Sequence, residues 1–256
     1  MEHSATEILA AGAQVRSKGW PAMILFGDSI TEGIWHQDVY SFGAALSNAF
    51  SRRIQVLERG FSGYTSSNAR YIMDDVIPPA RGGLDMKLLV IFFGANDAAV
   101  PGSLQHIDIA EYKEHLKAIA NHLYVKDHGA KVVIVTPPPV CEHKCLPSHD
   151  RRSAITKQYA EAAIEVADEV GVEVVKLWHV FMDYAGWKEG DPLLGDINVP
   201  KSDKLDELLS DGLHLTGKGY QLYFDTFMKV LEEKVPEIYN HERGYPHWHE
   251  APKYGE

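Results

Sequence analysis

Three residue types that could together transfer an acyl group occur in two short segments of the chain. Ser29 lies in Gly-Asp-Ser-Ile-Thr, directly after an apolar run, where a hydroxyl at the start of a helix would be exposed. Asp211 and His214 lie three residues apart late in the chain. Within one tight turn, that spacing lets the carboxylate reach the imidazole and fix its tautomer. The three types are a nucleophile, an orienting acid and a base.

Two further segments supply hydrogen-bond donors. Residues 59–66 read Arg-Gly-Phe-Ser-Gly-Tyr-Thr-Ser, and Gly63 lies in a turn there that can aim backbone N–H groups at a ligand. Asn96 follows another apolar run in Gly-Ala-Asn-Asp and offers a side-chain amide. Taken singly, Asp28 or Ser29 fits an N-cap and Asn96 fits a turn. Taken together, the four segments provide the parts that acyl transfer requires.

Five short apolar runs alternate with helical patterns and would position these segments. The runs are residues 23–26, 54–57, 88–93, 132–135 and 172–177, and the clearest helical patterns cover 112–126, 154–170 and 216–230. Runs that are apolar on both faces are typical of parallel strands covered on both sides. The alternation predicts a doubly wound α/β fold, in which ligands bind beyond the carboxyl ends of the strands.

Composition excludes several classes of partner. The 25 basic and 36 acidic residues give a net charge of −11, which argues against nucleic acid and anionic membranes as partners. The longest fully apolar run, residues 88–93, is too short for a membrane span, and Glu2 and Glu7 lie where a signal peptide needs basic residues. We therefore expect a cytoplasmic protein. Its length favours a single domain over residues 1–256, with a core at about 20–235 and a C-terminal tail at about 236–256.

The two cysteines do not predict a metal site. Cys141 and Cys145 flank His143 in Cys-Glu-His-Lys-Cys, a spacing that is not Cys-x-x-Cys and has no second ligand pair. Two thiols on a long polar loop, residues 137–152, are the favoured interpretation, with half a zinc site or a local disulfide as alternatives. Loops of this length are often lids over a site. The histidine-rich segment after residue 236 is interpreted as a terminal tail rather than a metal site.

Other catalytic motifs are absent or incomplete. The Gly-x-Ser-x-Gly elbow of the α/β-hydrolase fold does not occur. Residues 212–219 approach a P-loop, but Gly219 stands where a Ser or Thr must reach Mg²⁺. A non-catalytic binding module on the same fold is the alternative from another class, and it would not need the Ser29 and His214 pair that this chain has.

The four segments resemble the sequence blocks of the GDSL, or SGNH, hydrolases and occur in the order of that family. They are Phe-Gly-Asp-Ser-Ile-Thr at 26–31, Arg-Gly-Phe-Ser-Gly-Tyr-Thr-Ser at 59–66, Phe-Gly-Ala-Asn-Asp-Ala at 93–98 and Asp-Gly-Leu-His at 211–214. Ile30 departs from the leucine of the family name. Within the family, the second block and the run Asp-Gly-Leu-His-Leu-Thr-Gly-Lys-Gly-Tyr are most similar to isoamyl acetate-hydrolysing esterases.

The resemblance implies a three-layer, flavodoxin-like fold and a serine-dependent carboxylic-ester hydrolase that needs no cofactor or metal. By motif position, Ser29 is the nucleophile, His214 the base and Asp211 the third triad member. The oxyanion hole would consist of the Ser29 and Gly63 N–H groups and the Asn96 amide. The expected substrate is a short-chain, acetate-type ester of a small alcohol. Carbohydrate deacetylation and lysophospholipid hydrolysis stay open as alternatives, and the subfamily resemblance alone suggests a homodimer.

Overall fold

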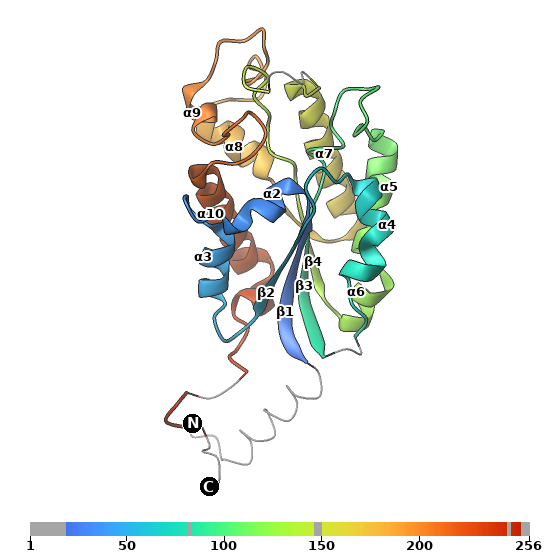
Figure 1. The fold of residues 1–256 in the computed structure, drawn as a ribbon, viewed down its shortest axis with the longest axis vertical. Coiled ribbons are helices and arrows are strands. Elements are labelled where there is room, and N and C mark those ends of the chain that lie inside the picture. Colours follow the sequence, from blue (N-terminus) through green and yellow to red (C-terminus); the bar gives the residue numbers. More distant parts are fainter. Residues whose placement is uncertain (1–18, 81–82, 146–149, 245–246, 252–256) are drawn as a thin grey trace.

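The computed structural model describes residues 19–80, 83–145, 150–244 and 247–251, and its centre is one parallel sheet. The strands are β1 (Trp20–Gly27), β2 (Gln55–Gly60), β3 (Leu84–Phe92), β4 (Lys131–Val135) and β5 (Glu173–Val175). Their order is β2-β1-β3-β4-β5, and every neighbouring pair is parallel (Figure 1). This is the flavodoxin-like order, so the predicted fold class is confirmed.

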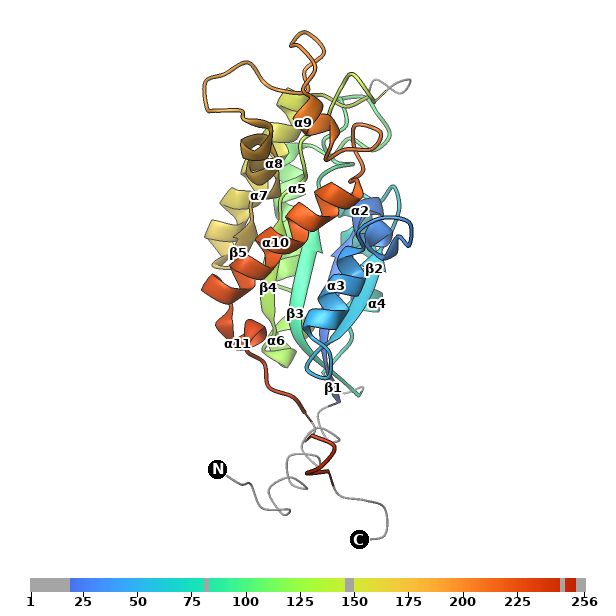
Figure 2. The same cartoon turned by 90° about the vertical axis from the view of Figure 1, so that its left-hand side faces the viewer.

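Helices cover both faces of the sheet, which gives three layers (Figures 1 and 2). The helices are α2 (Ser29–Glu32), α3 (Phe42–Ala49), α4 (Ser66–Val76), α5 (Ile109–Ala120), α6 (Leu123–His128), α7 (Ser153–Val170), α8 (Leu177–Ala185), α9 (Asp203–Asp206), α10 (Gly217–Lys234) and α11 (Pro236–Tyr239), with a short 3₁₀ turn η1 (Gly33–Trp35). One apolar core joins the sheet to α3, α8 and α10, and a second joins the opposite face to α4, α5 and α7.

The alternation of side chains along β1 shows why the strands are apolar throughout. Met23 and Leu25 belong to the core under α3, α8 and α10, whereas Ile24 and Phe26 belong to the core under α4, α5 and α7. A strand packed on both faces needs an apolar side chain at every position, because successive side chains point to opposite faces.

Most of the predicted elements differ by a few residues at their ends, and two of them are interrupted in the structure. The helix predicted over 112–126 is two helices, because α5 ends at Ala120 and the His122 ring accepts a hydrogen bond from the Tyr124 N–H at the start of α6. The fifth strand ends at Val175, and Leu177, which the sequence pattern assigned to this strand, begins α8. In both cases the apolar pattern continues across the break, and it therefore does not mark where one element ends and the next begins.

The strand order reverses between β1 and β3, and this reversal brings the sequence segments together. After β1 the chain crosses to β2 on one side, and after β2 it crosses back to β3 on the other. Such a switch point leaves a crevice at the carboxyl ends of the two central strands. Gly27 ends β1 there, and a Cβ at this position would lie 2.7 Å from the Phe92 carbonyl oxygen at the end of β3. The close approach of the two strands therefore requires glycine.

Candidate active site

Ser29 is the first residue of α2, directly beyond the carboxyl end of β1. The preceding Asp28 is the N-cap of this short helix and accepts a hydrogen bond of 2.9 Å from the Ile30 N–H. The first N–H groups of a helix have no partner within the helix, so the Ser29 N–H lies where it can donate to a ligand. Asp28 therefore takes the capping role, which leaves the hydroxyl of Ser29 for another role.

His214 and Asp211 reach Ser29 from a turn far along the chain. The His214 Nε2 atom lies 2.9 Å from Ser29 Oγ, and His214 Nδ1 lies 2.7 Å from Asp211 Oδ2. A carboxylate accepts but does not donate, so Nδ1 carries the hydrogen and Nε2 is free to accept one from Ser29. The same carboxylate accepts the backbone N–H groups of Leu213 and His214 through Oδ1, at 3.0 and 2.8 Å.

The electrostatics of Asp211 favour its charged form. Partial burial alone would raise the pKa of this carboxyl, but the hydrogen bonds from the His214 ring and from the His214 and Leu213 amides outweigh burial and lower the pKa below its usual value. The carboxylate is thus held as an anion beside the imidazole, where it would stabilise an imidazolium.

The turn that carries these residues packs against the Cys-Glu-His-Lys-Cys segment. The Cys141 N–H donates to the Gly212 carbonyl at 2.8 Å, and a Cβ on Gly212, whose φ is +93°, would lie 2.5 Å from the Cys141 carbonyl oxygen. Cys141 and Cys145 are thiols that do not form a disulfide with each other. The described ranges contain no cluster of three or more His, Cys, Asp or Glu that could hold a metal ion. The segment therefore supports the Asp211–His214 turn.

Gly63 and Asn96 line the same cavity as Ser29. Gly63 occupies the third position of a turn closed by the Tyr64 N–H on the Phe61 carbonyl at 3.0 Å, and its φ of +79° favours glycine. Asn96 follows β3, is 4% exposed and donates from Nδ2 to the Tyr64 carbonyl at 2.9 Å. The second N–H of the Asn96 amide is available to a ligand.

All five residues singled out from the sequence line one cavity of about 410 Å³. They are Ser29, Gly63, Asn96, Asp211 and His214, and the cavity is completed by Ser62, Gln105, Lys144, Cys145, Asp150, Arg151 and Leu213. The sequence motifs did not indicate Gln105, which donates to the Gly63 carbonyl, or Arg151, which donates to Asn96 Oδ1. Neither lies in a recognisable block, so no local signal could have found them.

Two buried carboxyls, Asp28 and Asp97, are the chain neighbours of Ser29 and Asn96. Burial raises the pKa of Asp28 to about 7, against the hydrogen bond from Ile30, and the charge of Asp97 raises it further. Among the described residues, none donates a hydrogen bond to Asp28 Oδ2. Burial likewise raises the pKa of Asp97 to about 6, although this carboxyl accepts hydrogen bonds from the backbone and side chain of Ser66. Asp97 thereby ties the loop after β3 to the start of α4.

Asp28 should make stability depend on pH. Its folded pKa of about 7 exceeds the ordinary value of 3.8, so the folded state holds the proton more tightly, and stability falls as pH rises from about 4 to 7. Asp28→Asn removes this titration. Urea unfolding at pH 5 and pH 8 should show the variant gaining free energy of unfolding relative to the parent as pH rises. The exposed Asp38→Asn is the control, and a parent–variant difference that stays constant across this range would contradict the argument.

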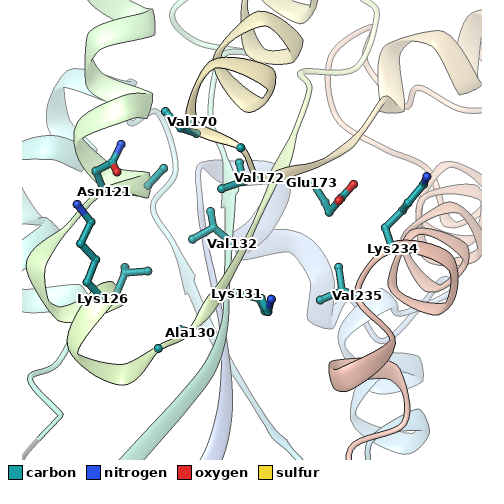
Figure 3. Close-up of a pocket in the computed structure, with 14 residues that line it drawn as sticks. Asn121, Lys126, Ala130, Lys131, Val132, Val170, Val172, Glu173, Lys234 and Val235 are labelled. Carbon is teal, nitrogen blue, oxygen red and sulfur yellow. The ribbon is translucent and has the colours of Figure 1, made fainter.

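A second cavity, of about 380 Å³, lies at the opposite end of the sheet (Figure 3). Lys126, Lys131 and Lys234 line it, and Lys131 pairs with Glu237 at 2.7 Å. The C-caps of four helices also line it, namely Asn121, Gly129, Gly171 and Val235. Helix C-termini carry partial negative charge, so the lysines at this cavity are placed where they offset that charge.

Comparison with known proteins shows the class of enzyme and the family to which the chain belongs. The α/β fold and the match to a family of acylhydrolases define a carboxylic-ester hydrolase of the SGNH type. The chain belongs to the GDSL-like lipase/acylhydrolase family, whose model matches residues 25–222.

Named relatives extend over most of the chain. The human isoamyl acetate-hydrolyzing esterase 1 homolog is 34% identical over 230 residues, covering 86% of this chain and 84% of that protein. The isoamyl acetate-hydrolyzing esterase of Saccharomyces cerevisiae is 29% identical and covers 84% and 88%. The solved lipase/acylhydrolase of Enterococcus faecalis superposes with a TM-score of 0.61 at 22% identity, covering 83% of this chain and 95% of that chain, and shows the same fold.

In the described part of the chain, no helix is both long and apolar enough to span a membrane.

Proposed function

We propose that the chain is a serine esterase that cleaves short-chain acyl esters, in particular acetate-type esters of small alcohols, through an acyl-enzyme on Ser29. The observation that carries this proposal is the continuous series of contacts from Ser29 Oγ through the His214 ring to the Asp211 carboxylate, at 2.9 and 2.7 Å. Family membership supports ester hydrolysis, and the geometry supports the assignment of roles.

In the first step, Ser29 Oγ attacks the carbonyl carbon of the ester. His214 Nε2 takes the hydroxyl proton as the new C–O bond forms, and Asp211 stabilises the resulting imidazolium. The π electrons of the carbonyl move onto its oxygen. The Ser29 and Gly63 N–H groups and the Asn96 amide donate to that oxyanion, which carries more charge than the carbonyl of the bound ester.

In the second step, the tetrahedral intermediate collapses and the alcohol leaves. His214 gives its proton to the alcohol oxygen as the C–O bond breaks, which leaves an acyl group on Ser29. Water then attacks this acyl-enzyme while His214 takes a proton from the water. Collapse of the second intermediate releases the carboxylic acid and returns the proton to Ser29 Oγ. These steps use only water and side-chain and backbone groups of the protein, so we propose no metal or cofactor.

The names of the relatives support a small acyl group. Those of the human and yeast relatives point to isoamyl acetate, the ester of a short acid and a small alcohol. The polar lining, which includes Gln105, Lys144 and Asp150, favours acetylated carbohydrates as the second candidate. Lysophospholipid hydrolysis, which would require a preference for long acyl chains, is the third candidate.

We expect kcat/KM to be highest for acetate to butyrate in a nitrophenyl ester series and to fall for octanoate and longer chains. The reason is that the human and yeast relatives are named for an acetate ester. Isoamyl acetate and an acetylated xylooligosaccharide, assayed alongside, separate the two alcohol classes. Ser29→Ala gives the background rate. A maximum at octanoate or above would contradict the short-chain assignment and point to a lipase or thioesterase.

The remaining assignments stay predictions from the sequence. We propose a small-molecule ester as the partner of the site and neither nucleic acid nor membrane. The cytoplasmic location, the homodimer and the single domain over residues 1–256 rest on the charge, length and resemblance described above.

A further inference from the structure

Arg151 is a buried residue that is hydrogen-bonded to one candidate oxyanion donor, Asn96. The residue is 4% exposed, and Nη2 donates to Asn96 Oδ1 at 3.2 Å and to Gln105 Oε1 at 2.8 Å. Gln105 continues the network, because its Nε2 donates to the Gly63 carbonyl at 2.8 Å. One guanidinium is therefore connected directly to Asn96 and, through one amide, to the backbone at Gly63.

The hydrogen-bond inventory of Arg151 leaves no donor for a substrate. Nε donates to the Ala95 carbonyl at 3.1 Å, and Nη1 contacts the Asp150 carbonyl at 3.4 Å and the Asp150 carboxylate at 2.8 Å. Together with the two bonds from Nη2, these contacts use all five N–H groups of the guanidinium. A buried charge is stable only when it is paired in this way. Arg151 therefore acts on a ligand through other residues.

The network fixes the orientation of both amides. A guanidinium only donates and the Tyr64 carbonyl only accepts, so Asn96 must place Oδ1 on Arg151 and Nδ2 on Tyr64. A flipped amide would place Oδ1 against the Tyr64 carbonyl and Nδ2 against the guanidinium. The same reasoning fixes Gln105 between Arg151 and Gly63. Only in this orientation does Asn96 present an N–H to the cavity.

The backbone around Arg151 holds the guanidinium in place. Arg151 forms an isolated antiparallel bridge with Ala99, and the Val100 N–H donates to the Asp150 carbonyl at 2.9 Å. Two residues later Ser153 begins α7, and its N–H donates to buried Glu142 at 2.9 Å. The side chain is thus anchored between the loop after β3 and the first turn of a long helix.

We propose that Arg151 is the positioning residue of the oxyanion hole, holding the Asn96 amide directly and the Gly63 turn through Gln105. This inference rests on the proposed function, because it assigns Asn96 and Gly63 the oxyanion role. Lysine keeps the charge of Arg151 but is a single point donor that cannot replace the planar fork. The hydrogen bonds to Asn96 and Gln105 therefore require the planar guanidinium and not only a positive charge.

The test compares Arg151→Lys and Arg151→Met with the parent enzyme in the hydrolysis of nitrophenyl acetate. The number of active sites in each preparation is counted by complete labelling with a fluorophosphonate, and the rates are divided by this number. Unfolded protein is therefore not counted. We expect kcat per site to fall about tenfold or more for Lys and further for Met, towards the 10²–10³-fold cost of losing one oxyanion donor. KM should change less than about threefold, because the ester carbonyl carries little charge before attack.

A double-mutant cycle shows whether Arg151 acts through Asn96. In an Asn96→Ala background, Arg151→Lys should cost much less than it does in the parent, because the main group it positions is already gone. Arg53→Lys is the matched control. Arg53 also donates to backbone carbonyls, those of Tyr239 and Ala49, but lies outside the cavity. Its variant should lose stability and keep kcat per site.

Gln105→Ala tests the connection from Arg151 to the Gly63 turn, and it does so even if Arg151→Met does not fold. It should lower kcat per site by several-fold, because it releases only Gly63. The proposal is overturned if Arg151→Lys or Gln105→Ala keeps kcat per site within about twofold of the parent, or if the cycle is additive. Failure of the proposed function looks different, because the parent enzyme itself would then not hydrolyse the ester or would not require Ser29.

Discussion

Ser29→Ala should lower kcat for short-chain esters by roughly 10⁴–10⁶-fold, the largest single loss that we expect anywhere in the chain. The hydroxyl is the only group of Ser29 that contacts His214, so alanine removes the attacking oxygen and leaves the backbone of α2 in place. The N–H of residue 29 is retained. KM should therefore change little, because the cavity and the remaining oxyanion donors still bind the ester.

The matched control for this prediction is Ser62→Ala. Ser62 lines the same cavity, but the contact that the structure records for it is made by its backbone N–H, which donates to the Glu32 carboxylate at 2.7 Å. Its alanine variant should keep kcat within a few-fold of the parent. Unchanged turnover in Ser29→Ala, measured with parent-free protein, would show that hydrolysis does not proceed through this serine.

Asn96→Ala should lower kcat by about 10²–10³-fold, or roughly 3–4 kcal/mol of transition-state stabilisation, with little change in KM. Asn96→Asp should be at least as damaging. It is nearly the same size and can still accept from Arg151, but it replaces the amide donor with an anion that faces the developing oxyanion. Steady-state kinetics per phosphonate-titrated site measures both effects.

A turn role for Asn96 predicts a different pattern from an oxyanion role. Asn68, whose Oδ1 accepts the Thr65 N–H at 3.0 Å in the capping box of α4, is a structural asparagine and the appropriate control. Asn68→Ala should lower the free energy of unfolding by roughly 1 kcal/mol and keep kcat. If the two Asn96 variants behaved like Asn68→Ala, with reduced stability and near-normal kcat, the oxyanion assignment would be wrong.

Much of the candidate site could be predicted, because each of its residues lies in a short sequence motif and the order of the strands brings these motifs together. Ser29 and Asn96 each follow a strand, and neighbouring parallel strands place their carboxyl ends side by side. Asp211 and His214 contact each other within one turn, so their spacing alone was informative. The apolar runs located all five strands for the same reason, since burial on both faces leaves a simple pattern.

The parts that could not be predicted depend on contacts between distant segments. Arg151 reaches Asn96 across 55 positions, and Gln105 reaches Gly63 across 42. No spacing rule connects them, and both lie in loops whose paths are set by tertiary packing. The break between α5 and α6 was missed because the His122 ring cap has no counterpart in the usual N-cap residue types. Element ends are therefore less predictable than element types.

The central claim, covalent catalysis by Ser29, is tested most directly by mass spectrometry after treatment with a fluorophosphonate. Trypsin cleaves at Arg52 and Arg59, so Ser29 falls in a different peptide from Ser62 and Ser66. The account predicts one adduct per chain, on the peptide that contains Ser29, formed as esterase activity disappears. An adduct on the peptide of Ser62 and Ser66, or complete loss of activity with Ser29 unmodified, would contradict it.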